Sequence, residues 1–157
     1  MRGTMVCGVS ESSEGRAAVE LGVDLSERLG LRLVLAHVVE GFYPHDVEQD
    51  GPESVARKGD RIQAERLLAV LAKEYGVAAT AVCRSAVGDR AELLGQIAAE
   101  EAADVIVVGS RVRGWRGRGL ESSLAEELKG ATKVPVLIAP PRARARPRLP
   151  ATNGVRG

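Results

Sequence analysis

The sequence contains few aromatic residues and few cysteines. Phenylalanine, tyrosine and tryptophan together make up 3 % of its 157 residues, too few for the aromatic platforms on which single-stranded nucleic acid stacks. Cys7 and Cys83 are the only cysteines, and two thiols make no disulfide framework. Both lie in strand-like segments, where a lone cysteine usually behaves as a small buried hydrophobe. The core must therefore consist of aliphatic side chains.

Histidine is equally scarce. Neither His37 nor His45 has a cysteine or a second histidine three to five residues away, so the common zinc-ligand spacings are absent and we expect no metal site. The segment Gly8–Ser12 begins like the nucleophile elbow of a hydrolase but lacks its second glycine. No carboxylate is placed to orient His45. We therefore expect His37 to be a hydrogen-bonded strand residue, and we predict no catalytic residue and no enzymatic activity.

Long apolar runs are also missing. No stretch of eighteen consecutive apolar residues occurs, as a membrane-spanning helix would require. The first five residues, Met-Arg-Gly-Thr-Met, contain no apolar core of a signal peptide. We expect a cytoplasmic protein without membrane contact.

The net charge of +1 conceals an uneven distribution. Residues 141–157 hold five arginines and no acid, which leaves 17 basic and 21 acidic residues in the rest of the chain, a net charge of −4. Such a folded part has no basic face for duplex DNA, so we expect no specific nucleic-acid partner. The tail 141–157 has no apolar residue larger than alanine or proline before Leu149, and we predict that it is disordered.

Five short apolar segments have the composition of strands: 4–9, 31–39, 77–85, 104–108 and 134–139. Their nearly continuous apolar residues indicate strands covered on both faces, as in a parallel sheet. The first should be the central strand. Pro135 suits an edge strand, because proline donates no hydrogen bond to a neighbour.

Four segments with helical spacing of apolar residues lie between these strands. We expect the first helix to end at Gly30, the second to begin at Pro52 and end at Gly76, and the last to begin at Ser123. Asp89 occupies the N-cap position of the third helix, whose inward face we predict from spacing: Leu94, Ile97, Ala98 and Ala102. Residues 40–51 should form a surface loop.

This alternation predicts one α/β domain over residues 1–140. We expect a Rossmann-like, five-stranded parallel sheet of order 3-2-1-4-5, with helices on both faces. Ligands of such sheets bind at the carboxyl ends of the strands, where the strand order reverses. Here that point lies between the first and fourth strands.

The segment Asp104–Leu128 combines a buried strand, a loop rich in glycine and arginine, and a helix. Backbone N–H groups and the positive end of a helix would together favour an anion. Four arginines at 111–118 either pair with phosphates or form a solvated charged loop. Ser123, with Glu126 three residues later, forms a capping box, a role compatible with a phosphate contact.

Five motifs in this order resemble those of the universal stress protein family: Cys7–Ser13, Leu35–Val38, Val87–Asp89, Asp104–Arg111 and Val134–Pro140. The resemblance covers residues 4–140. It implies a small cytoplasmic α/β protein that forms a homodimer through antiparallel pairing of its last strand, Val134–Ala139. Some members of that family bind ATP, and others do not.

ATP-binding members share the pattern Gly-x2-Gly-x9-Gly-Ser/Thr. In this sequence Gly109 matches the first glycine and Ser123 the final serine, whereas Val112 and Ser122 replace the other two glycines. Ser10 also stands where the family usually has aspartate. The spacing is retained, but valine resists the positive φ and the close phosphate approach that glycine permits.

The resemblance therefore implies a degenerate adenine-nucleotide pocket. It places adenine against the backbone near Val38, the ribose near Ser10 and Gly109, and the phosphates over Ser110, Ser122 and Ser123. Our leading hypothesis is a non-enzymatic, homodimeric stress-response protein with weak affinity for ATP or another adenine nucleotide. One alternative is a functional ATP-binding switch, with slow hydrolysis, whose loop arginines bind the phosphates. Another is an interaction module recognised through its surface and tail.

Overall fold

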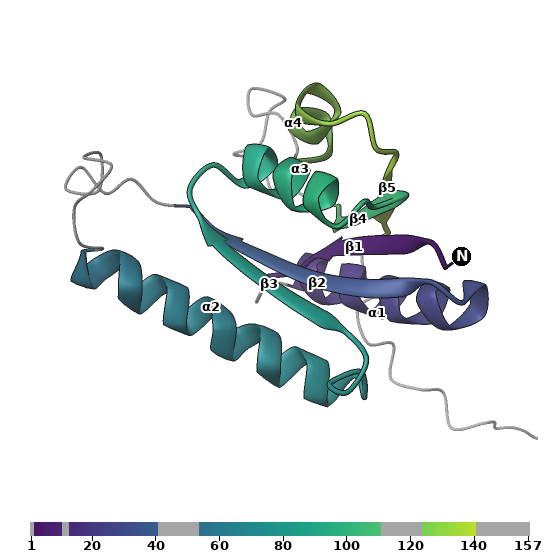
Figure 1. Cartoon of the computed structure of the whole chain (residues 1–157), viewed down its shortest axis with the longest axis horizontal. Coiled ribbons are helices and arrows are strands. Elements are labelled where there is room, and N and C mark those ends of the chain that lie inside the picture. The colour runs from purple at the N-terminus through teal and green to yellow at the C-terminus, as the bar shows by residue number, and fades with distance from the viewer. Residues whose placement is uncertain (1, 11–12, 41–53, 111–123, 141–157) are drawn as a thin grey trace, which may run out of the picture.

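The computed structural model describes residues 2–10, 13–40, 54–110 and 124–140. Strands and helices alternate along these residues (Figure 1), in the order β1 (Thr4–Gly8), α1 (Ser13–Leu29), β2 (Arg32–Val39), α2 (Val55–Glu74), β3 (Val82–Val87), α3 (Arg90–Glu100), β4 (Val105–Gly109), α4 (Leu124–Ala131) and β5 (Val136–Ala139). The predicted loop 40–51 and tail 141–157 fall, apart from Glu40, outside the described residues.

All strands are parallel, and their order in the sheet is β3-β2-β1-β4-β5. Helices α1 and α2 cover one face, and α3 and α4 cover the other (Figure 1). The predicted Rossmann-like architecture is confirmed, with β1 in the centre. Strand β5 is an edge strand, as Pro135 indicated.

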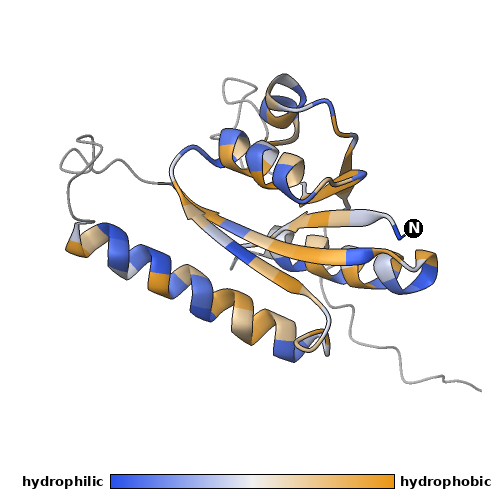
Figure 2. Cartoon of the chain, in the orientation of Figure 1, coloured by the Kyte–Doolittle hydropathy of each residue, from blue (hydrophilic) through white to orange (hydrophobic). Residues whose placement is uncertain are grey.

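Successive strand residues enter two different cores, because side chains of a strand alternate between the faces of a sheet. Leu33 and Leu35 of β2 pack among α1 and α2. Val34, Ala36 and Val38 pack among α3 and α4. The strands are accordingly hydrophobic along most of their length (Figure 2).

The two cysteines differ in their surroundings. Cys7 is fully buried, its Sγ donates to the carbonyl of Ala18 at 3.1 Å, and burial raises the pKa of its thiol to about 12. Cys83 is exposed, so the expectation of burial is wrong for this residue. The reason is that β3 is an edge strand, in which no residue is fully buried.

Two elements begin three or more residues later than predicted, whereas the other strands differ from their expected ranges by one or two residues. Helix α2 begins at Val55 rather than Pro52, because Ser54 is its N-cap and accepts a hydrogen bond from Arg57 N at 3.2 Å. Strand β3 begins at Val82 rather than Val77. The carbonyl of Val77 instead accepts from the N–H groups of Thr80 and Ala81, at 3.1 and 2.8 Å, which makes a turn.

At the two ends of α3, one prediction is confirmed and one is wrong. Asp89 is the N-cap, since its Oδ1 accepts from Glu92 N at 2.8 Å. Ala102, predicted on the inward face, is exposed and lies beyond the helix with φ of 53°. It occupies the left-handed position after a helix that glycine usually fills.

None of the helices in the described parts of the chain is long and apolar enough to cross a membrane.

Candidate functional site

The carboxyl ends of β1 and β4 lie side by side in the centre of the sheet. Cys7 pairs with Val107, and the ladder between these strands ends there. The following segments, Val9–Ser10 and Gly109–Ser110, therefore leave the same edge of the sheet next to each other. The sheet extends from β1 to β2 and β3 on one side, and from β4 to β5 on the other, so the strand order reverses between β1 and β4. This is the predicted switch point.

Ser10 is packed against the first turn of α1. A Cβ atom added to Gly15 would lie 2.1 Å from Ser10 Oγ and 2.5 Å from its backbone nitrogen. Only glycine at position 15 allows this approach. The Ser10 side chain consequently lies at the positive end of the helix dipole. In the sequence, nothing distinguishes Gly15 from an ordinary turn glycine.

Val9, the residue before Ser10, is bonded to β2 through both of its backbone groups. Its N–H donates to the carbonyl of Ala36 at 2.8 Å, and its carbonyl oxygen lies 2.8 Å from His37 Nδ1. A carbonyl oxygen only accepts, so Nδ1 carries the proton. The prediction of His37 as a hydrogen-bonded strand residue is confirmed.

Val38 can contact a ligand through its backbone groups but not through its side chain. The side chain is 3 % exposed and packs in the core beneath α3 and α4. In a parallel strand, the N–H and C=O of one residue point to the same neighbour. Those of Ala36 point to β1, because Ala36 O accepts from Val9 N, so those of Val38 point that way too. The β1 ladder ends at Gly8 opposite Ala36, and no strand pairs with this edge of Val38 in the described residues.

Gly109 and Ser110 lie at the end of β4. Gly109 pairs with Ala139, and Ser110 N donates to the carbonyl of Ala139 at 3.2 Å. The Oγ atom of Ser110 is buried and has no hydrogen-bond partner in the described part of the chain. A buried hydroxyl without a partner costs about 1–3 kcal/mol. It is therefore a group that a ligand atom would stabilise.

The topology thus gathers Ser10, Val38, Gly109 and Ser110 at one edge of the sheet. Ser122, Ser123 and the arginines of 111–118 lie outside the described residues. Helix α4 begins at Leu124, directly after Ser123. The end of β2 is joined to the start of α3 by an ion pair, Arg90 to Glu40, at 3.2 Å. No sequence signal distinguished this pair from other exposed charges.

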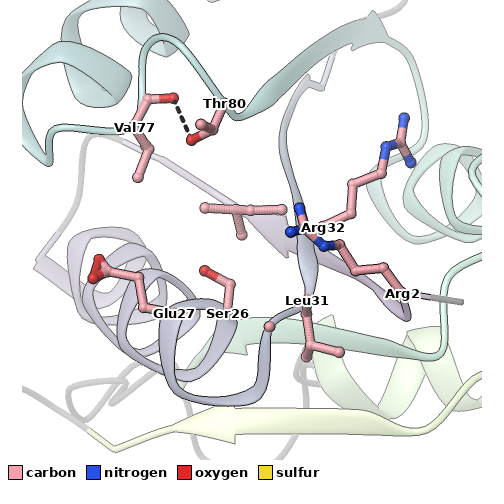
Figure 3. Close-up of a pocket in the computed structure, with 9 residues that line it drawn as sticks. Arg2, Ser26, Glu27, Leu31, Arg32, Val77 and Thr80 are labelled. Carbon is pink, nitrogen blue, oxygen red and sulfur yellow. Dashed lines mark hydrogen bonds between the residues drawn. The ribbon is translucent and has the colours of Figure 1, made fainter.

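A second concave region, of about 250 Å³, lies at the opposite end of the sheet, between the last turn of α1 and the turn before β3 (Figure 3). Three of its polar side chains, Ser26, Thr80 and Arg32, already form hydrogen bonds within the fold. Ser26 Oγ and Thr80 Oγ1 donate to carbonyls three residues earlier, at 2.9 and 3.4 Å. Arg32 is bonded to Glu101 at 2.7 Å. The carboxyl edge is therefore the better candidate for a ligand site.

Within residues 2–10, 13–40, 54–110 and 124–140, no three histidine, cysteine, aspartate or glutamate side chains form a group that could hold a metal ion.

Several known proteins are similar to this chain in sequence or in fold. Universal stress protein Sll1654 of Synechocystis sp. is 28 % identical over 141 residues, which are 87 % of this chain and 85 % of that protein. The structure of protein MJ0577 aligns with a TM-score of 0.72 at 19 % identity, over 92 % of this chain and 99 % of that one. A universal stress protein solved in complex with cAMP aligns with a TM-score of 0.59 at 25 % identity, over 89 % and 98 %.

The family itself is identified by a match over most of the chain. The model of the Universal stress protein family matches residues 1–140. This range includes every described element and all five motifs that resembled the family. The chain belongs to the universal stress protein family.

Proposed function

We propose that this protein is a non-enzymatic, homodimeric stress-response protein of the cytoplasm that binds ATP or another adenine nucleotide weakly. The observation that carries the proposal is the backbone edge of Val38, whose N–H and C=O point past the end of β1 toward the switch point. Adenine presents an amino donor beside a ring-nitrogen acceptor. An adjacent backbone acceptor and donor match that edge.

The phosphates would lie on the β4 side of the site. The buried, unpartnered hydroxyl of Ser110 supports this orientation, because it offers a donor where the glycine-rich loop begins. Weak affinity is expected from the sequence, since Val112 and Ser122 replace glycines and Ser10 replaces an aspartate. The cAMP complex of a related universal stress protein supports an adenine nucleotide as the ligand.

The absence of catalysis is supported by the bonding of His37. Its Nδ1 bonds the backbone carbonyl of Val9 rather than a carboxylate. A hydrolase triad needs a carboxylate in that place to hold the imidazolium that forms during the reaction. His37 therefore lacks the partner that a general base of this type requires.

A homodimer through β5 is supported by the exposed apolar side chains of that strand. Leu137 is 40 % and Ile138 45 % exposed, and no strand of the described residues pairs with the outer edge of β5. Antiparallel pairing of two copies would satisfy the backbone groups of this edge and cover both side chains.

Titration calorimetry with ATP tests the nucleotide proposal. We expect a dissociation constant weaker than about 10 μM, which corresponds to about −7 kcal/mol. Replacing Ser110 by alanine should weaken it several-fold. Thr80→Ala, at the opposite end of the sheet, should leave it unchanged. A dissociation constant of 10 μM or tighter would favour the functional ATP switch instead, and no binding at millimolar ATP would contradict the proposal.

A further inference from the structure

The hydrogen bonds between β1 and β2 follow a regular series. At its start Arg32 N donates to Gly3 O, and at its end Val9 N donates to Ala36 O, both at 2.8 Å. In a parallel ladder the bonds of one edge come from alternate residues. The next donor in the series is therefore the N–H of Val38, and the next acceptor is the carbonyl of Val9.

This next bond is not formed. The carbonyl of Val9 accepts from the imidazole Nδ1 of His37 at 2.8 Å, and no bond from Val38 N to this carbonyl occurs in the described residues. A side chain of β2 has taken the place of a backbone N–H of the same strand. The ladder consequently stops one bond early, and the chain is free to leave the sheet at Ser10.

We propose that His37 is a positioning residue of the nucleotide site. By bonding the Val9 carbonyl, it keeps β1 from pairing with Val38 and leaves the Val38 N–H free for a ligand. This inference rests on the proposed adenine contact at Val38. It adds that the contact exists only because of a neighbouring side chain that does not itself touch the ligand.

A purely structural role of His37 makes a different prediction. If the imidazole only satisfies the Val9 carbonyl, its removal leaves that carbonyl unpaired and changes nothing at Val38. If it holds the strands apart, its removal lets the Val38 N–H donate to Val9. The two roles therefore differ in the hydrogen bonding of the Val38 amide.

Amide hydrogen exchange of the full-length protein without nucleotide distinguishes them. In His37→Leu we expect the Val38 amide to exchange at least about tenfold more slowly than in the unsubstituted protein, because it has gained a backbone acceptor. In His37→Asn the rate should stay unchanged, since the asparagine amide can replace Nδ1 as donor. An unchanged rate in His37→Leu, or equal slowing in both variants, would overturn the proposal.

Calorimetry with ATP provides the second measurement. We expect His37→Leu to weaken binding about tenfold and His37→Asn to stay within about threefold. Equal affinity of His37→Leu and the unsubstituted protein would overturn the positioning role. If the unsubstituted protein binds no nucleotide, the proposed function fails by itself, and the exchange experiment still decides whether His37 holds Val38 open.

Discussion

Arg84 on β3 forms an ion pair with Glu101, the C-cap residue of α3. The same carboxylate accepts from Arg32 of β2 at 2.7 Å, and it is 14 % exposed. Arg84 also bonds Glu100. Two carboxylates at the negative end of a helix are unfavourable by themselves. The two arginines offset this cost and fasten the end of α3 to two strands.

Removing the charge of Glu101 should therefore destabilise the fold. We expect Glu101→Gln to lower the free energy of unfolding by about 1–2 kcal/mol, because two charge-assisted hydrogen bonds are weakened. Urea denaturation measures this. Glu65→Gln, which breaks an exposed pair with Arg61 at 3.2 Å, should change stability by less than about 0.5 kcal/mol. Equal losses of stability in the two variants would show that the Glu101 carboxylate contributes no more than an exposed ion pair.

The same carboxylate should make stability depend on pH. The Arg32 guanidinium, with a contribution from Arg84, holds the pKa of Glu101 below its ordinary value. The stabilisation is therefore complete above the unfolded-state pKa of about 4.3, and it is lost as the pH falls through the lower pKa of the folded state. Denaturation series from pH 7 to pH 3 should show declining stability below about pH 5. A decline of the same size in Glu101→Gln would contradict this assignment.

Replacing Ala102 by glycine should stabilise the fold. Its φ of 53° is costly for a residue with a Cβ atom. We expect Ala102→Gly to raise the free energy of unfolding by about 0.5–1 kcal/mol, even after the greater entropy of glycine in the unfolded chain. Ala99→Gly, within α3, should lower it by about 1 kcal/mol. Thermal denaturation of both variants gives the comparison.

Only one of the two thiols should react while the protein is folded. Cys83 is exposed, whereas Cys7 is buried and has its pKa raised to about 12 by burial. A thiol-reactive chromophore at neutral pH should label one cysteine of the folded protein and both in denaturant. Cys83→Ser should show no labelling while folded. Rapid labelling of that variant would mean that α1 opens from β1 in the native state.

Charged residues on β5 should separate the proposed dimer. We expect a double substitution of Leu137 and Ile138 by lysine to yield a monomer, since two like charges would face their counterparts across the new strand pair. Light scattering at micromolar concentration measures the mass. Leu29→Lys, an exposed apolar residue elsewhere at 63 % exposure, should keep the dimer. A monomeric unsubstituted protein would contradict the interface.

The strand order and most helix limits could be predicted from the sequence because local signals and the fold agree. The apolar runs form strands, and Gly30 and Gly76 follow α1 and α2 with positive φ. Asp89 is the N-cap of α3. The start of β3 could not be predicted. Val77 is apolar and buried like a strand residue, but its carbonyl accepts two turn hydrogen bonds.

The position of Ser10, Val38, Gly109 and Ser110 at one edge of the sheet could be predicted, but their hydrogen bonding could not. Parallel topology alone brings Ser10, Gly109 and Ser110 to one edge. The direction of the Val38 backbone depends on which residue of β2 faces which strand, and this register is fixed by packing of the whole sheet. The same holds for His37, whose partner is 28 residues away in sequence.

The alternation of side chains along β2 has an evolutionary consequence. Leu35 meets only the core beneath α1 and α2, and Val34 meets only the core beneath α3 and α4. A change of volume at either residue must be compensated within its own core. Substitutions should therefore accumulate as two separately covarying sets, interleaved residue by residue along a single strand.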